Sequence, residues 1–328
     1  MILADAPPPM PPPEGARLGL ELPAEGLAGT SAAPVLAVGD GGAFLLAWEQ
    51  RADGEADIVF RRREAGAPGV PGRVCAPPDQ TRLVEPVLRL DTDAPGASRS
   101  IEPRIAAGPK GLVIVAWQDN RGGADHIRVN RSTDGGRSFG DHDVAPDSLA
   151  RSSSPAPGLA TMPALAVDHD GRAYVAWEDR RSGERDIYFA RSLDGGASWL
   201  PALRVDSDPA GTGISYHPQI VAWAGGTVLV CWWDERDGLS DVYVRRSTDG
   251  GASWTRPETR LDSGKSGRAP SHDVAVESRG NSVTLTWVEG REGSVNPTHP
   301  SSRKVASRTS KDRGASWRAL GSQMRRIA

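Results

Sequence analysis

The chain has 328 residues, of which 38% are hydrophobic and 25% charged, and its formal net charge is −3. This apolar content suffices for a folded core and argues against a disordered chain, and a near-neutral chain without a basic run lacks the electrostatic footprint of a nucleic-acid-binding protein. No apolar run approaches the roughly 18 residues of a membrane span. We therefore expect a folded domain with neither a nucleic-acid partner nor a membrane span.

Residues 1–16 predict a flexible leader, because they are rich in proline, which favours extended and solvated backbone. The leader lacks the apolar core, roughly 7–15 residues long, of a signal peptide. Arg17–Leu22 alternates weakly, as an edge strand would. Length alone would suggest about two domains, but evenly spaced repeats favour one, so we interpret residues 17–328 as a single repeat domain.

Each repeat begins with a short apolar strand that follows a proline, as in Pro163–Val167, and continues into a hairpin turn such as Asp170–Gly171. A second strand, almost continuously apolar as in Leu112–Trp117, then ends in a tryptophan. Such a run is typical of a strand that is covered on both faces. The tryptophans at this position are Trp48, Trp117, Trp177, Trp232 and Trp287.

A third strand leads into an eight-residue turn that begins Ser-x-Asp and ends in an aromatic residue. Its hydroxyl and carboxylate groups accept backbone N–H groups, and its glycines supply the positive φ of a tight turn. A short fourth strand follows, as in Leu203–Asp206. The four copies are Ser132–Phe139, Ser192–Trp199, Ser247–Trp254 and Ser310–Trp317, whose aspartates are 60, 55 and 63 residues apart (134 to 194 to 249 to 312).

Five units of four antiparallel strands at this spacing predict an all-β fold, a β-propeller with four-stranded blades. In the first unit Arg63–Gly66 replaces the turn motif, and the fifth unit carries an insertion between Arg291 and Arg303. Arg17–Leu22 would lie beside the fifth unit and close the ring. The alternative is a six-bladed ring that has lost one unit through truncation of the chain.

The four turns resemble the Asp-boxes, or BNR repeats, of the sialidase superfamily, and the resemblance extends over residues 34–317. In that family the Asp-box joins the third and fourth strands of a blade on the side away from the active site. The resemblance also implies a glycan or glycoconjugate ligand and a secreted or cell-surface location. It makes the box aspartates structural residues: Asp134, Asp194, Asp249 and Asp312.

The turn after the second strand carries an acid and an arginine at the same two positions in several repeats. Because the pattern is nearly the same each time, we favour ion pairs that belong to the scaffold. The alternative is a ring of donors and acceptors that binds sugar hydroxyls blade by blade. The acids are Asp119, Asp179 and Asp234, and the arginines are Arg121, Arg181 and Arg236.

The residues that enter the first strands differ among the repeats. Two of these entries, at Ala33 and Met162, have no titratable side chain. The other three read Glu102-Pro103-Arg104, Tyr216-His217-Pro218 and His272-Asp273. Titratable groups that break the repeat near the axis indicate a ligand pocket on the face opposite the Ser-x-Asp turns.

Resemblance to the sialidases implies a tyrosine nucleophile, an acid that protonates the leaving oxygen, and three arginines that bind the substrate carboxylate. Tyr216 is the best-placed tyrosine, and Asp273 or Glu102 would be the acid. Arg104 partly matches the family's first arginine, but no motif assigns the other two. Alternatively, Arg104 pairs with Glu102, Tyr216 packs against the following proline, and His217 is a solvated turn residue.

The leading hypothesis is a propeller that recognises glycans, most concretely by exo-acting hydrolysis of terminal sialic-acid-type sugars. One rival is the same fold without catalysis, which would bind a carbohydrate or a protein through the Asp/Arg ring and aromatics such as Trp233. A second rival is a structural module of a larger surface protein, with the Pro-rich leader as its linker.

Cofactors, metals and disulfides are not expected. The six histidines show no spacing of metal ligands, so we predict no metal site and no cofactor, and we expect a monomer. Cys231 lies in a predicted strand, where burial as a small apolar residue is favoured over a disulfide with Cys75.

Overall fold

The computed structural model describes residues 29–52, 54–64, 86–149, 159–263, 266–290 and 304–319. The predicted leader, the strand expected at Arg17–Leu22, Cys75 and the insertion of the fifth unit lie outside these residues. Within them the regular structure is strand, apart from two short 3-10 helices, η1 (Asp40–Gly42) and η2 (Pro146–Leu149).

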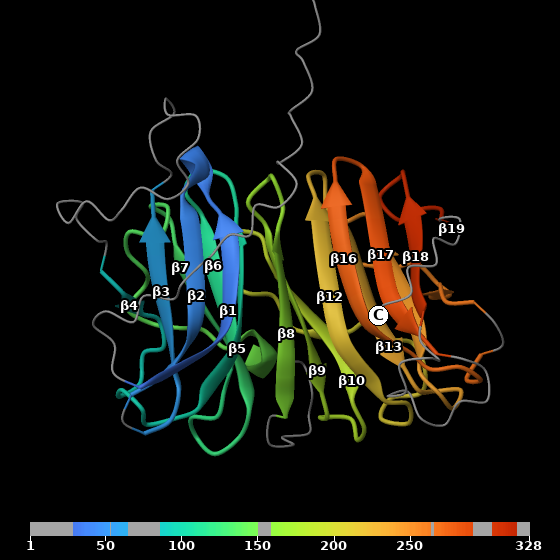
Figure 1. The fold of residues 1–328 in the computed structure, drawn as a ribbon, viewed down its shortest axis with the longest axis horizontal. Coiled ribbons are helices and arrows are strands. Elements are labelled where there is room, and N and C mark those ends of the chain that lie inside the picture. Colours follow the sequence, from blue (N-terminus) through green and yellow to red (C-terminus); the bar gives the residue numbers. More distant parts are fainter. Residues whose placement is uncertain are drawn as a thin grey trace, which may run out of the picture.

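Five antiparallel sheets follow one another along the chain, one for each predicted repeat (Figure 1). The first contains β1 (Thr30–Val38), β2 (Phe44–Arg51), β3 (Asp57–Arg63) and β4 (Leu88–Arg89). The second contains β5 (Ser100–Ala107), β6 (Val113–Asp119) and β7 (His126–Ser132). The third contains β8 (Ala160–Val167), β9 (Ala173–Asp179), β10 (Asp186–Ser192) and β11 (Leu203–Arg204).

The fourth sheet contains β12 (Ser215–Trp223), β13 (Thr227–Asp234), β14 (Asp241–Ser247) and β15 (Thr259–Arg260). The fifth contains β16 (Ser271–Arg279), β17 (Ser282–Glu289), β18 (Lys304–Ser310) and β19 (Arg318–Ala319). In each sheet every strand pairs with the next one along the chain. The prediction of an all-β propeller with antiparallel blades is confirmed.

The second blade has three strands where four were predicted. In place of a fourth strand, Val144 forms a single antiparallel bridge with Val129 of β7. Pro146 follows two residues later and begins η2. Because proline has no backbone N–H, it cannot extend the pairing.

The second strand of each blade lies inside its sheet, and in the second, third and fourth blades it is buried on both faces, whereas in β17 buried and half-buried residues alternate. Every residue of β6 and β9 is buried. Cys231 of β13 is buried and free, as expected of a small apolar residue. The tryptophan predicted to end each strand lies two or three residues before the end in the structure and is buried: Trp48, Trp117, Trp177, Trp232 and Trp287.

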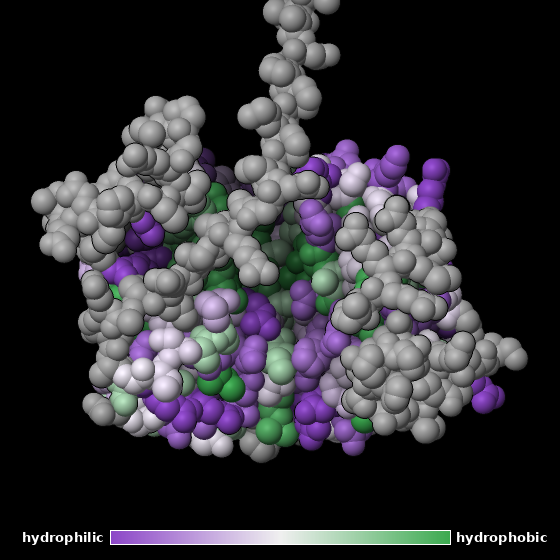
Figure 2. Space-filling view, in the orientation of Figure 1, coloured by the Kyte–Doolittle hydropathy of each residue, from purple (hydrophilic) through white to green (hydrophobic). Residues whose placement is uncertain are grey.

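The blades pack in chain order through their first strands: β1 contacts β5, β5 contacts β8, β8 contacts β12, and β12 contacts β16. No strand pairing joins β1 to β16 in the part of the chain that the structure describes. At the β1 end of the series, Leu36 and Val38 are partly exposed. Figure 2 shows hydrophobic side chains along the middle of the face that is turned toward the viewer.

The Ser-x-Asp turns share one hydrogen-bond pattern. In the third blade the Ser192 hydroxyl donates to Asp194 and accepts the Gly196 N–H, both at 2.7 Å. The hydroxyl and backbone N–H of Ser198 donate to the same carboxylate at 2.5 and 2.9 Å. Burial raises the pKa of Asp194, but these hydrogen bonds outweigh burial and lower the pKa to about 2. The same serine-to-carboxylate bonds occur at Asp134, Asp249 and Asp312.

The aromatic residue that ends each turn packs against the preceding blade. Trp254 meets Phe189 edge to face, with ring centroids 5.0 Å apart, and Phe139 meets Phe60 at 4.8 Å. Gly251 has a φ of +80°, and a Cβ there would lie 2.4 Å from the Phe189 ring. The turn therefore needs glycine both for its backbone and for the approach of the two blades.

Candidate functional site

The two ends of each blade differ. In the second blade Ser132, which starts the Ser-x-Asp turn, pairs with Val113 at the beginning of β6, whereas Ser100 at the start of β5 pairs with Asp119 at the end of β6. The Ser-x-Asp turns thus lie at one end of the strands. The entries into the first strands, with the predicted site residues, lie at the other end, which we call the entry face.

Every first strand has a β-bulge at the entry face, and one non-glycine residue in each bulge has a left-handed φ. In four blades the next residue is a proline, which cannot donate to the neighbouring strand. Strained backbone of this kind concentrates at functional sites. The predicted residues Glu102, His217 and Asp273 occupy equivalent positions around the propeller. The φ values are +46° at Ala33, +54° at Glu102, +52° at Met162, +48° at His217 and +55° at Asp273.

Two of these bulges are held by a glutamate of the preceding blade. The Glu102 N–H donates to Glu49, and the His217 N–H donates to Glu178, both at 2.8 Å. Each of these glutamates directly follows the buried tryptophan near the end of a second strand. The bulge geometry is therefore built into the packing of the blades.

Aromatic and charged side chains gather where the third and fourth blades meet. Tyr216 of β12 and Trp233 of β13 are cross-strand partners, and their rings stack with centroids 4.1 Å apart. The His217 ring lies 5.7 Å from Trp233. The Arg185 guanidinium lies 5.1 Å from the Tyr216 ring centre and 3.1 Å from Glu178. Three predicted site residues thus form one group, the Tyr216 cluster.

The surroundings of the Tyr216 hydroxyl favour its protonated form. Burial raises the pKa of Tyr216, and the negative charge of Glu235 raises it further. Burial also raises the pKa of Glu178, against the hydrogen bond from the His217 backbone, and the pKa of Glu235, which lies beside Asp234. The Tyr216 hydroxyl therefore stays protonated at neutral pH.

The other predicted catalytic residues form separate pairs. Glu102 accepts hydrogen bonds from Arg104 at 3.2 and 3.3 Å, which is the pairing that the sequence allowed as an alternative to substrate binding. Asp273 lies 2.9 Å from His272, and its side chain is 71% exposed. Among the described residues, no hydrogen bond, ion pair or ring contact joins either pair to Tyr216.

The repeated acids and arginines of the entry face pair with each other. Asp234 accepts the Trp232 indole N–H at 3.2 Å and two guanidinium N–H groups of Arg236 at 2.6 and 2.8 Å. Because each of these aspartates is at most 1% exposed, a sugar cannot reach the carboxylates in this arrangement. The geometry favours the scaffold interpretation, and sugar binding by the ring stays a prediction. The other pairs are Asp119 with Arg121, at 2.6 Å, and Asp179 with Arg181, at 2.5 Å.

Two cavities, of about 180 and 410 Å³, lie beside the Ser132–Phe139 turn between the first and second blades. None of their lining residues is a predicted site residue. Neither cavity lies at the Tyr216 cluster.

Sequence reasoning missed Arg185, Glu178 and Glu235 as members of the Tyr216 cluster. Glu178 stands directly after a repeat tryptophan, where the other blades have Glu, Gln, Trp and Val. This variation was only a weak signal, because Glu49 holds the bulge of the next blade in the same way as Glu178. Arg185 carries no such signal, because it lies in a loop between repeat positions.

The fold resembles solved carbohydrate-active enzymes. It superposes on a Hadza microbial sialidase with a TM-score of 0.50 at 17% identity, over 85% of this chain and 54% of that one. It superposes on an α-L-arabinanase of Penicillium chrysogenum with a TM-score of 0.51 at 13% identity, over 88% and 80%. An α-L-arabinofuranosidase of Fusarium graminearum gives 0.50 at 13% identity, over 87% and 79%.

At these identities the likeness establishes the propeller fold alone. The chain spans about half the length of the sialidase that it matches. No family model and no curated protein matches the sequence. Within the described residues, no helix is long and apolar enough to cross a membrane.

Proposed function

We propose that this propeller acts on carbohydrates at its entry face and, most concretely, that it hydrolyses terminal sialic-acid-type sugars in an exo manner. The observation that carries the proposal is the Tyr216 cluster, in which an aromatic stack, a guanidinium and carboxyl groups meet at a strained bulge. Aromatic faces bind the apolar faces of sugar rings, and guanidinium groups bind carboxylates. The enzymes with a similar fold, which include a sialidase, an α-L-arabinanase and an α-L-arabinofuranosidase, support the substrate class.

The proposed reaction uses Tyr216 as the nucleophile. Its hydroxyl oxygen forms a bond to the anomeric carbon and gives its proton to Glu235, while the bond from that carbon to the leaving oxygen breaks. Asp273 or Glu102 protonates the leaving oxygen. Water then attacks the glycosyl-tyrosine: its hydroxyl joins the sugar, its proton goes to the carboxylate of Asp273 or Glu102, and the proton held by Glu235 returns to the tyrosine. Arg104 and Arg185 bind the substrate carboxylate.

The second candidate is glycan binding without turnover. It is favoured by the separation of the Glu102–Arg104 pair from the Tyr216 cluster and by the raised pKa of Tyr216, since a nucleophile is activated by a lowered pKa or an adjacent base. The two candidates share the same surface and differ only in whether a proton donor reaches the bound sugar.

Turnover of a fluorogenic sialoside, with a fluorogenic arabinofuranoside measured in parallel, tests the proposal. We expect sialoside hydrolysis by the wild type and a loss of about a thousandfold or more in kcat for Tyr216→Phe, because the nucleophile is gone. Tyr188→Phe is the matched control, since Tyr188 lies within β10 and stacks on Trp177.

Equal turnover by the wild type and Tyr216→Phe would remove Tyr216 from the mechanism. Hydrolysis of the arabinofuranoside alone would contradict the sialic-acid assignment. Saturable sugar binding that is lost in Trp233→Ala, without turnover of either substrate, would establish the second candidate instead.

A further inference from the structure

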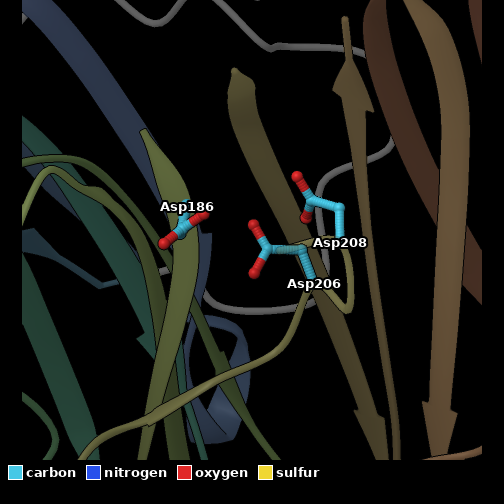
Figure 3. A group of neighbouring side chains, drawn as sticks. All are labelled: Asp186, Asp206 and Asp208. Atoms are coloured by element: carbon cyan, nitrogen blue, oxygen red, sulfur yellow. The ribbon is translucent and has the colours of Figure 1, made fainter. Parts of the chain in front are cut away.

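Three carboxylates meet beside the junction of the third and fourth blades, outside the Tyr216 cluster. Asp186 begins β10, and Asp206 and Asp208 follow β11. Their ligand oxygens lie within 4.8 Å of one another, and Figure 3 shows the side chains of Asp206 and Asp208 directed toward Asp186. The residues are 0%, 3% and 9% exposed, respectively.

Hydrogen bonding within this group is incomplete. Asp186 accepts the Gly211 N–H, and one oxygen of Asp206 accepts the Ile187 N–H at 2.8 Å. The other oxygen of Asp206 and both oxygens of Asp208 have no hydrogen-bond donor among the described residues. Buried polar atoms are almost always hydrogen-bonded, so three unsatisfied oxygens in one place point to a ligand such as a water or an ion.

The first blade shows what the repeat supplies at this place. Asp93, the equivalent of Asp208, accepts the hydroxyl of Ser98 and the Arg89 guanidinium. Gly213 stands where Ser98 would be, two residues before the serine that begins the next first strand. A Cβ on Gly213 would lie 2.4 Å from Asp208 Oδ2. The third blade therefore lacks the hydroxyl donor. The Asp208 carboxylate occupies the space that a side chain at position 213 would fill.

One arginine faces all three carboxylates. Arg204 Nη1 lies 3.1 Å from Asp186 Oδ1 and 3.6 Å from Asp208 Oδ1, and its Nε lies 3.4 Å from Asp206 Oδ1. These contacts are ion pairs, but only the contact with Asp186 is a side-chain hydrogen bond. A single guanidinium therefore balances one of three negative charges.

The second nearby cation is already committed. Arg236 lies 3.8 Å from Asp208 but is bound by Asp234 at 2.6 Å and by Glu258 at 2.5 Å. The three carboxylates therefore have only the Arg204 guanidinium to themselves, and a divalent cation would supply further positive charge.

We propose that Asp186, Asp206 and Asp208 bind a divalent cation of the calcium type. Ca²⁺ takes about 6–8 oxygen ligands at roughly 2.3–2.6 Å, so opposite ligands lie about 5 Å apart, close to the spread observed here. Asp208 supplies two free oxygens and Asp206 one, and water completes the shell. The cation ties the end of the third blade to the segment that enters β12, which carries Tyr216.

Calcium titration of the full chain after removal of divalent ions tests the proposal. Isothermal titration with CaCl₂, with MgCl₂ in parallel, should show one Ca²⁺ per chain, and Ca²⁺ should raise the midpoint of thermal unfolding. Asp208→Asn should weaken Ca²⁺ binding at least tenfold. Gly213→Ser should also weaken it, because it restores the donor that the first blade has. Asp93→Asn is the matched control and should leave Ca²⁺ binding unchanged.

Absence of Ca²⁺ binding by the wild type, seen as neither heat nor a shift in unfolding, would overturn the proposal. So would binding that Asp208→Asn leaves intact, or an equal loss in Asp93→Asn, since either result places the ion elsewhere. Thermal unfolding without Ca²⁺ checks that both variants are folded, because Gly213→Ser has an ordinary φ but places a Cβ 2.4 Å from Asp208 Oδ2. Unchanged Ca²⁺ affinity in Gly213→Ser would contradict the role given to the missing hydroxyl.

Discussion

The aromatic rings of Tyr216 and Trp233 stack across β12 and β13 with centroids 4.1 Å apart and planes 25° apart. Each blade has a cross-strand pair at this position, but the other four pairs are not both aromatic. The stack therefore breaks the repeat in one blade, as a site for a single sugar requires. The equivalent pairs are Ala32 with Glu49, Ile101 with Gln118, Thr161 with Glu178, and His272 with Val288.

Removal of the Trp233 ring should weaken sugar binding. We expect Trp233→Ala to lower the affinity for sialic acid about tenfold, because a stacked aromatic contributes roughly 0.5–1.5 kcal/mol beyond its buried area. Trp233→Phe should retain most of the affinity, since it keeps a stacking face. Isothermal titration measures both. Equal affinities for the wild type and Trp233→Ala would place the ligand elsewhere.

Loss of one scaffold carboxylate should destabilise the fold. Asp179→Ala leaves the partly buried Arg181 guanidinium without its 2.5 Å partner, so we expect the free energy of unfolding in urea to fall by about 3 kcal/mol. The double variant Asp179→Ala/Arg181→Met should recover part of this loss, because it removes the unpaired charge. Unchanged stability together with lost sugar binding would instead favour the ring of sugar ligands.

A side chain added at a crowded glycine of the Ser-x-Asp turn should cost more unfolding free energy than one added at a glycine where only the backbone is strained. Gly251 and Gly122 both have positive φ, +80° and +84°, but only Gly251 has a neighbour, the Phe189 ring, at a clashing distance. Gly122→Ala should cost about 1 kcal/mol of unfolding free energy, and Gly251→Ala should cost about 1–3 kcal/mol more. Chemical unfolding compares the two, and equal costs would refute the tight contact between blades.

Acid should weaken the turns in a defined pH range. The pKa of Asp194 and that of Asp249 are each lowered to about 2 in the folded protein, from about 3.9 in an unfolded chain. Their stabilisation is therefore present above about pH 4 and is lost as pH falls toward 2. Ser198→Ala removes one donor to Asp194, so the free energy of unfolding should fall less steeply over this range. An unchanged slope of unfolding free energy against pH in Ser198→Ala would contradict the assignment of this pH dependence to Asp194.

The fold was predictable because its determinants are local. The Ser192 hydroxyl and Asp194 carboxylate bind backbone groups within four residues, so the sequence alone reveals the turn. The short fourth strands were less predictable, as the single bridge at Val144 shows. A strand of only two residues has no sequence pattern of its own, so whether it pairs depends on how the surrounding residues place the chain.

The site was predictable only in part. Tyr216 and His217 were found because they interrupt a repeat, but Glu178 reaches His217 from 39 residues away along the chain. The carboxylate group around Asp208 was missed for a similar reason. Its distinguishing feature is a hydroxyl absent at Gly213, and the spacing of acids does not reveal a missing donor.

The most direct test of the account is a crystal structure of the protein with sialic acid at a saturating concentration. The account predicts the sugar at the entry face, in contact with the rings of Tyr216 and Trp233 and with its carboxylate near Arg185. A sugar bound at the end that carries the Ser-x-Asp turns, or an entry face that stays free of it at saturation, would contradict the account.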